Sequence, residues 1–158
     1  MQSCELICCR MAGPATLTCY GNKRKNEMTV PEKKKILRKW LMAMQAGDLQ
    51  AIQSLQTKDC TWILPGSKKL PWAGSWTGMA RQKLFLKQIK NSVEFEKLEF
   101  REFIGEGAHI TILGQEVARS KTRGKRWNVT FSWVFKIKRG KVARWEAFEN
   151  TEIIASCF

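Results

Sequence analysis

The chain has 158 residues, 44% of them hydrophobic, so it is long enough to form one domain with a substantial buried core. Its 28 Lys and Arg residues outnumber its 14 Asp and Glu residues and give a net charge of +14. No apolar run approaches the roughly 18 to 20 residues that a membrane span needs, which excludes a transmembrane segment and favours a soluble protein.

The positive charge belongs to the domain rather than to a detachable tail. Residues 1–27 contribute only two units of it, and the remainder is spread over residues 28–158. A field of this sign attracts nucleic acid, anionic membranes or small anions by long-range steering. Charge alone does not distinguish among these partners.

Residues 1–27 differ in character from the rest of the chain. They show no sustained helical or strand period, and Gly13-Pro14 and Gly21-Asn22 interrupt them. We therefore expect a disordered or non-native extension ahead of a domain at residues 28–158.

The extension holds four of the six cysteines, Cys4, Cys8, Cys9 and Cys19, without a paired CxxC motif or a nearby His. This spacing does not suit a metal site, and the segment is a poor signal peptide. We therefore expect free thiols and a cytoplasmic protein, with acylation of the adjacent Cys8 and Cys9 left open.

The first clear helix signal begins at Thr29. The segment from Thr29 to Glu32 fits a capping box, and apolar residues then recur at helical spacing: Ile36, Leu37, Trp40, Leu41 and Met44. Gly47 ends this predicted helix and Asp48 caps the next one. The lysines between the apolar positions are predicted to form a solvated face.

A short strand is predicted at Cys60–Leu64, followed by a long loop that contains Pro65-Gly66 and Pro71-Trp72-Ala73-Gly74. Thr77 then caps a helix that runs to about Lys90.

The second half of the chain changes to a period of two. Four long strands are predicted, joined by short turns and followed by a closing helix at Thr151–Cys157; the strands are Val93–Ile104, Ile110–Arg119, Trp127–Lys138 and Val142–Asn150. Consecutive strands with short turns pair antiparallel, so we expect a curved meander against which the helices pack.

This order of elements, with the motifs A-G-D, W-x-x-P-G, P-W-A-G and G-K-V-x-R-W, resembles the SnoaL-like and ketosteroid-isomerase-like group of the nuclear transport factor 2 superfamily. The resemblance covers residues 30–156. It implies an α+β fold, a cone-shaped curved antiparallel sheet wrapped by three N-terminal helices, also described as a cystatin-like half barrel. It also implies a homodimer through the outer sheet face, on which we expect Val142 and Phe148.

The resemblance also indicates which family chemistry is missing. The general base of ketosteroid isomerases corresponds to Leu64, the oxyanion-donor tyrosine to Trp40, and the protonated acid to a place near Trp133. A hydrocarbon does not take a proton, so this mechanism is not retained, although the indole N–H groups of Trp40 and Trp133 remain hydrogen-bond donors.

The sister group of limonene-epoxide-hydrolase-like proteins needs an Arg and two Asp residues. Their R-x-D and W-R-D motifs correspond to Glu116-Val117-Ala118 and Trp145-Glu146-Ala147. Alanine stands at both aspartate positions, and glutamate, with the opposite charge, stands at the arginine positions. Epoxide hydrolysis of this type is therefore not expected.

Glu116 is the most informative polar residue. It is the only charge in a strand face formed by Ile110, Ile112, Gly114, Glu116 and Ala118. Burial would raise its pKa and suit it to proton transfer or ligand anchoring. We expect a pocket around it with the ligand-binding residues Trp40, Trp62, Leu64, Trp72, Trp76, Trp133 and Trp145. The alternative is a filled core in which Glu116 pairs with Arg101 or Arg144.

The sequence is therefore compatible with two alternative functions. The first is a pocket protein for a hydrophobic or polycyclic small molecule, either a binder or a cyclase- or isomerase-like enzyme that needs no cofactor. The second is a noncatalytic basic module that binds nucleic acid, another polyanion or an acidic protein. Its basic residues flank two successive turns, at residues 119–126 and 136–141, which lie at opposite ends of a meander.

Overall fold

The computed structural model describes residues 28–158, so the expectations for residues 1–27 and their four cysteines lie outside the described residues. The elements follow in the order α1 (Val30–Ala46), α2 (Leu49–Leu55), β1 (Gln56–Leu64), β2 (Gly74–Thr77), α3 (Met79–Ser92), β3 (Val93–Glu106), β4 (His109–Ser120), β5 (Arg126–Lys138), β6 (Lys141–Glu149) and α4 (Thr151–Ala155).

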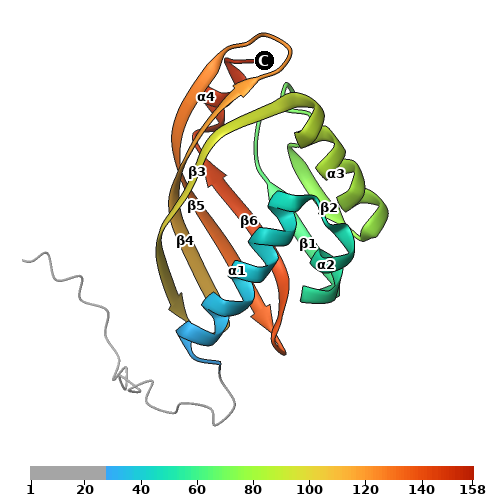
Figure 1. Ribbon diagram of the computed structural model, residues 1–158, viewed down its shortest axis with the longest axis vertical. Helices are drawn as coiled ribbons and strands as arrows, with labels where there is room; N and C mark the ends of the chain where they lie inside the picture. Colours follow the sequence, from blue (N-terminus) through green and yellow to red (C-terminus); the bar gives the residue numbers. More distant parts are fainter. Residues whose placement is uncertain (1–27) are drawn as a thin grey trace, which may run out of the picture.

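The six strands form one curved sheet in the order β2-β1-β6-β5-β4-β3. All neighbours pair antiparallel except β1 and β6, which are parallel. Figure 1 shows α1 crossing the inner face of the sheet, with α2 and α3 beside β1 and β2. The predicted α+β cone with helices on the inner face is confirmed.

Register shifts bend the sheet into this shape. They occur in the β3–β4 pair between Phe95 and Lys97 and between Phe100 and Glu102, and in the β5–β6 pair between Lys136 and Ile137. An extra residue on one strand increases the local twist and curvature. The long strands therefore curl around the helices rather than forming a flat sheet.

Helix α1 forms as its sequence predicts. The Thr29 side chain accepts a hydrogen bond from the Glu32 backbone N–H, and Glu32 accepts one from the Thr29 backbone in return. Gly47 ends the helix in the left-handed conformation, with φ at 66°. One lysine departs from the predicted solvated face, because Lys33 is buried and its Nζ donates to the Gly107 carbonyl in the β3–β4 turn.

The segment after β1 was predicted as a loop, and this was wrong for its last part. Residues Gly74–Thr77 form strand β2, antiparallel to β1. Thr77 does not cap α3, because its hydroxyl lies 2.8 Å from that of Thr61 across the strand pair. Gly78 stands at the N-cap instead and makes no side-chain hydrogen bond.

Val142 was predicted on the outer sheet face, and this was also wrong. Val142 is buried in the core, as is Trp145 on the same strand. The register shift in the β5–β6 pair turns both side chains to the same side of the sheet. Phe148 is on the outer face as expected, with 48% of its surface exposed.

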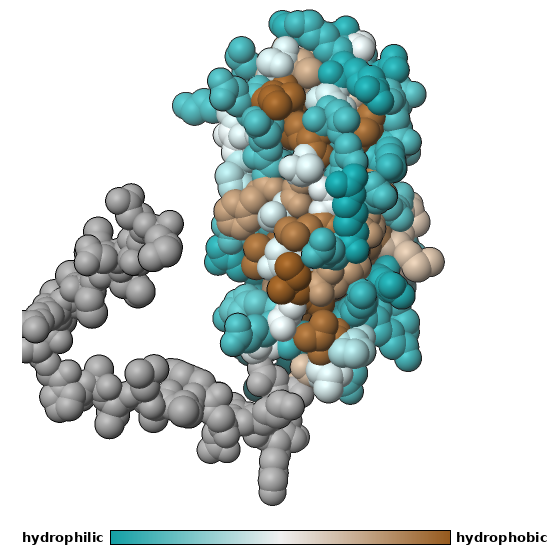
Figure 2. Space-filling view, turned by 90° about the vertical axis from the view of Figure 1, so that its left-hand side faces the viewer, coloured by the Kyte–Doolittle hydropathy of each residue, from teal (hydrophilic) through white to brown (hydrophobic). Residues whose placement is uncertain are grey.

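The outer side of the molecule near β3 and β4 is mainly hydrophilic. Figure 2 shows hydrophobic residues in a broken vertical band between hydrophilic ones. Ile104 of β3 is among the exposed large hydrophobic residues of the described part of the chain. Within residues 28–158, the helices are all too short or too polar to cross a membrane.

Gly114 allows the closest backbone approach in the sheet. A Cβ atom at this position would lie 2.2 Å from the Phe131 ring and 2.3 Å from the Glu99 carbonyl oxygen. Such distances force the ring or strand β3 to move. Glycine is therefore required where the curved strands meet the aromatic interior.

We predict that Gly114→Ala destabilises the fold by about 2 kcal/mol through overpacking. Thermal unfolding followed by circular dichroism should show a fall in Tm of roughly 5 °C. Combining G114A with Phe131→Leu should cost less than the sum of the single changes, because the smaller side chain relieves part of the clash. If the loss of stability in the double variant equalled the sum of the losses in the two single variants, this would contradict the explanation.

Candidate functional site

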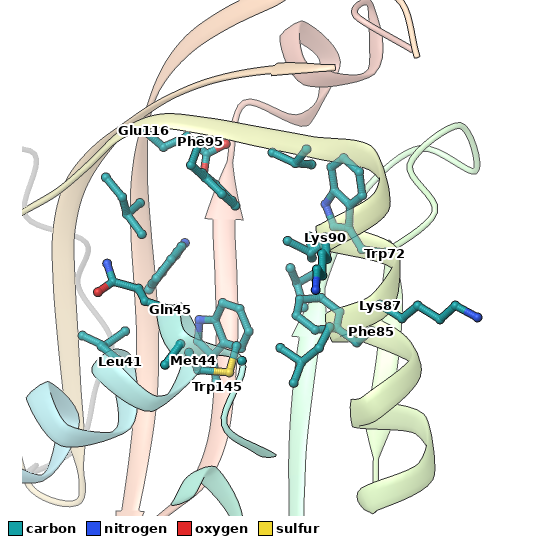
Figure 3. A pocket seen from close by; sticks show the side chains of 18 of the residues that line it. Leu41, Met44, Gln45, Trp72, Phe85, Lys87, Lys90, Phe95, Glu116 and Trp145 are labelled. Atoms are coloured by element: carbon teal, nitrogen blue, oxygen red, sulfur yellow. The ribbon is translucent and has the colours of Figure 1, made fainter. Parts of the chain in front are cut away.

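A pocket of about 800 Å³ opens between α1, α3 and the concave face of the sheet. Figure 3 looks into it, with Leu41, Met44 and Gln45 of α1 on one side and Phe85, Lys87 and Lys90 of α3 on the other. The wide end of the cone is therefore hollow, whereas the end near the β3–β4 turn is filled by α1.

The pocket wall is aromatic and aliphatic. Eight aromatic side chains line it: Trp40, Trp72, Phe85, Phe95, Phe100, Trp127, Trp133 and Trp145. Five of the seven expected ligand-binding residues lie in this wall, namely Trp40, Leu64, Trp72, Trp133 and Trp145.

The other two expected residues, Trp62 and Trp76, lie behind the wall. Each packs edge-on against Phe85, with ring centroids 5.4 Å and 5.7 Å away. The Trp62 indole N–H donates to the Gln56 side chain at 3.1 Å, and that of Trp76 donates to the Trp72 carbonyl at 2.8 Å. These two residues support the pocket wall without lining it.

Glu116 of β4 lines the pocket although only 5% of its surface is exposed. Its Oε1 accepts a hydrogen bond of 2.6 Å from the Trp127 indole N–H. The alternative ion pairs do not form, because Arg101 pairs with Glu99 and Arg144 pairs with Glu146 on the strands that carry them. Burial without a cationic partner disfavours the charged form of a carboxyl.

A second carboxyl, that of Glu149, was missed in the sequence. It lies on β6 and lines the same pocket, and its Oε1 accepts a hydrogen bond of 2.7 Å from the Trp133 indole N–H. Alternation along β6 from Trp145 through Ala147 to Glu149 places it on the inner face. That period-two pattern could have identified it.

The two carboxyls influence each other. Burial raises the pKa of Glu116 to about 8, the negative charge of Glu149 adds to this rise, and the hydrogen bond from Trp127 opposes it. Burial likewise raises the pKa of Glu149, against the hydrogen bond from Trp133. Glu116 is therefore mostly protonated at pH 7 and is able to donate or exchange a proton.

Trp40 and Trp145 also line the pocket, and their indole N–H groups have no hydrogen-bond partner in the described part of the chain. Their ring centroids are 5.5 Å apart in an edge-to-face arrangement. Trp40 also meets Trp62 and Phe135 edge-on. In such clusters the positive edge of one indole faces the π-electrons of another, which partly replaces a conventional hydrogen bond.

The two basic turns lie at opposite ends of the sheet, as the meander predicts. The β4–β5 turn lies at the end of the sheet near α4, and the β5–β6 turn lies at the other end (Figure 1). The structure therefore does not gather the basic residues of the two turns into one groove.

The described residues offer no cluster of three or more His, Cys, Asp and Glu side chains that could hold a metal ion. Cys60 and Cys157 are both buried and free. Burial raises the pKa of the Cys60 thiol to about 12, so this group stays protonated and unreactive at neutral pH. Neither thiol lines the pocket.

The family model of the SnoaL-like domain matches residues 37–145 of the chain. No curated protein matches this chain significantly. A solved NTF2-like protein from Burkholderia xenovorans LB400 is 24% identical, with a TM-score of 0.76 over 82% of this chain and 98% of that chain.

Two further solved structures have the same fold. An NTF2-like protein of unknown function from Burkholderia pseudomallei is 20% identical, with a TM-score of 0.72 over 82% of this chain and 98% of that chain. The protein TerC, co-crystallised with polyporic acid, is 22% identical, with a TM-score of 0.70 over 80% of this chain and 97% of that chain. At these identities the likeness shows the fold alone.

The raised pKa of Glu116 predicts a pH-dependent stability. Because the folded-state pKa of about 8 lies above the ordinary glutamate value of 4.5, the buried carboxyl stabilises the fold fully below pH 4.5. This stabilisation is lost as pH rises through about 8, at up to about 1.4 kcal/mol per pH unit. Urea unfolding of Glu116→Gln should therefore show a smaller loss of stability between pH 5 and pH 8 than the unmodified chain.

Glu102→Gln is the matched control, because Glu102 is exposed on β3. Its stability should follow the unmodified chain in parallel over the same pH range. If the free energy of unfolding of E116Q also changed with pH in parallel with that of the unmodified chain, this would contradict a buried, protonated Glu116.

Proposed function

This chain belongs to the SnoaL-like domain family, and on that premise we propose that its cone holds a hydrophobic or polycyclic small molecule. The observation that carries this proposal is the pocket of about 800 Å³ with eight aromatic side chains in its wall. This volume lies within the roughly 300 to 1,000 Å³ of small-molecule sites, which are mainly apolar with a few polar groups. TerC, which shares the fold, was co-crystallised with polyporic acid, and this supports a small-molecule ligand here.

In this proposal the indoles of Trp40, Trp72, Trp133 and Trp145, together with Leu64, contact the faces of the ligand. Trp62 and Trp76 hold Phe85 in place behind them. Flat ligands gain both from apolar burial and from offset or edge-on stacking with such rings. Residues 28–158 form the domain that carries the site, and residues 1–27 are an extension to it.

Glu116 is the proposed proton carrier. Its protonated carboxyl donates a proton to a ligand oxygen, and the carboxylate that this leaves accepts the proton released from another ligand position, while the neutral Glu149 carboxyl offers a hydrogen bond. A group of this kind suits an isomerisation or a cyclisation, in which a proton leaves one atom and enters another without net redox change. Such a reaction needs no cofactor.

We predict that Leu98→Gln weakens ligand binding about fivefold or more, because it places an amide in the apolar wall. Quenching of tryptophan fluorescence by a panel of neutral polycyclic compounds and by polyporic acid measures the affinity. For the neutral compounds, the affinity should be nearly constant between about 50 and 200 mM salt, whereas polyanion binding would weaken steeply.

Leu113→Gln is the matched control, since Leu113 is half-buried on the opposite face of its strand and lies outside the pocket wall. Its affinity should equal that of the unmodified chain. Equal losses in the two variants, or no saturable quenching by any compound, would contradict a ligand in the cone.

For any compound of the panel that the protein converts, Glu116→Gln should lower the turnover at least 100-fold, the usual contribution of a positioned acid or base. The affinity should change less than about threefold, because a glutamine oxygen still accepts the hydrogen bond from Trp127. The rate of conversion and the fluorescence titration separate these effects. Unchanged turnover would exclude Glu116 as the proton carrier.

A further inference from the structure

Four lysines lie along the α3 side of the pocket. Lys83, Lys87 and Lys90 belong to α3, and Lys121 follows β4. The intervals of four and three residues place the three α3 lysines on one face of the helix. Helix α3 also carries Arg81 but no Asp or Glu, so its positive charge has no compensation within the helix.

Ion pairs neutralise some basic residues of the described surface. On β3 and its neighbours, Glu96 pairs with both Arg119 and Arg126, and Lys97 pairs with Glu99. The four rim lysines, like most of the other described Lys and Arg residues, form no ion pair within the described chain. Their position at the pocket sets them apart. The only carboxyls in the pocket lining are those of Glu116 and Glu149.

Two of the rim lysines meet at one corner of the mouth. The Lys121 Nζ donates a hydrogen bond of 2.6 Å to the backbone carbonyl of Lys90. In Figure 3, Lys90 lies between Trp72 and Phe85, whereas Lys87 extends outward from α3. Positive charge is thus concentrated where the aromatic wall ends.

The interior does not balance this charge. Trp127 and Trp133 hold the Glu116 and Glu149 carboxyls within the pocket, and burial favours their neutral forms. An anion at the mouth is therefore attracted by the lysines and is not strongly repelled from below. An uncharged hydrophobic ligand would form no ion pair with these lysines.

From the unpaired lysine rim above an apolar pocket, we propose that the ligand is an amphipathic anion. Its hydrophobic, polycyclic body occupies the aromatic cavity, and a single oxyanion group, such as a carboxylate, sulfate or phosphate, lies at the mouth near Lys90 and Lys121. This inference rests on the proposed function, because it assigns the ligand class of the same pocket.

The test compares two probes with the same apolar body, 1-pyrenebutanoic acid and 1-pyrenebutanol, by energy transfer from the tryptophans of the full chain. The acid should bind about fivefold more tightly than the alcohol at 50 mM salt, since several weak ion pairs act together. This difference should shrink toward unity at 1 M salt, where charges are screened within about 3 Å. The alcohol should be insensitive to salt.

The variant Lys90→Gln with Lys121→Gln should weaken binding of the acid about threefold or more and leave the alcohol unchanged. The control Lys138→Gln with Lys141→Gln removes the same charge from exposed positions at the β5–β6 turn. Its affinity for the acid should remain close to that of the unmodified chain. Thermal unfolding of both double variants confirms that they fold.

Equal affinities for the two probes, or equal losses in the two double variants, would overturn the lysine-rim inference while leaving the pocket intact. Failure of both probes to bind would overturn the proposed function, and the inference with it. These failures are distinguishable, because the alcohol reports on the cavity alone and the ratio of acid to alcohol reports on the rim.

Discussion

The packing of Trp40 against the inner face of the sheet is the contact on which the rest of the structure depends. Its fully buried indole meets Trp62 of β1, Phe135 of β5 and Trp145 of β6, with ring centroids 5.5 to 5.7 Å apart. Edge-to-face pairs of this kind each contribute about 0.5–1.5 kcal/mol beyond the buried area. They hold α1 across the sheet, so the cone is filled on one side of Trp40 and hollow on the other.

The distribution of polar groups follows from this division. At the filled end, the buried Lys33 side chain donates to the Gly107 carbonyl. At the hollow end, Trp127 and Trp133 hold two carboxyls that have no cationic partner within the described chain. Burial is the main cause that raises the pKa of both carboxyls and keeps a proton in the pocket, although the net charge of the protein is +14. Leu64 of β1 and Trp40 of α1 carry a hydrocarbon and an indole, and the carboxyls of this pocket come from β4 and β6 instead.

Local signals predicted most of the elements. The capping box at Thr29, the glycine stop at Gly47 and the period-two pattern of four strands all depend on neighbours in sequence, and the structure reproduces each of them. Strand β2 was not predicted, because a four-residue strand that begins at Gly74 and ends before Gly78 carries little periodic signal. Its pairing partner is β1. Thr77 was assigned to a cap for a similar reason, since its hydrogen-bond partner Thr61 is remote in sequence.

The place of Glu116 as a charge within an apolar strand face follows from residue order alone, because alternation along one strand needs no knowledge of its neighbours. Three-dimensional packing was needed to show that Glu149 shares the pocket, that Arg101 and Arg144 pair elsewhere, and that Trp62 and Trp76 lie behind Phe85. Those outcomes depend on the parallel pairing of β1 with β6 and on the register shifts that curve the sheet. Register is set by the simultaneous packing of distant segments, which residue order along one strand does not encode.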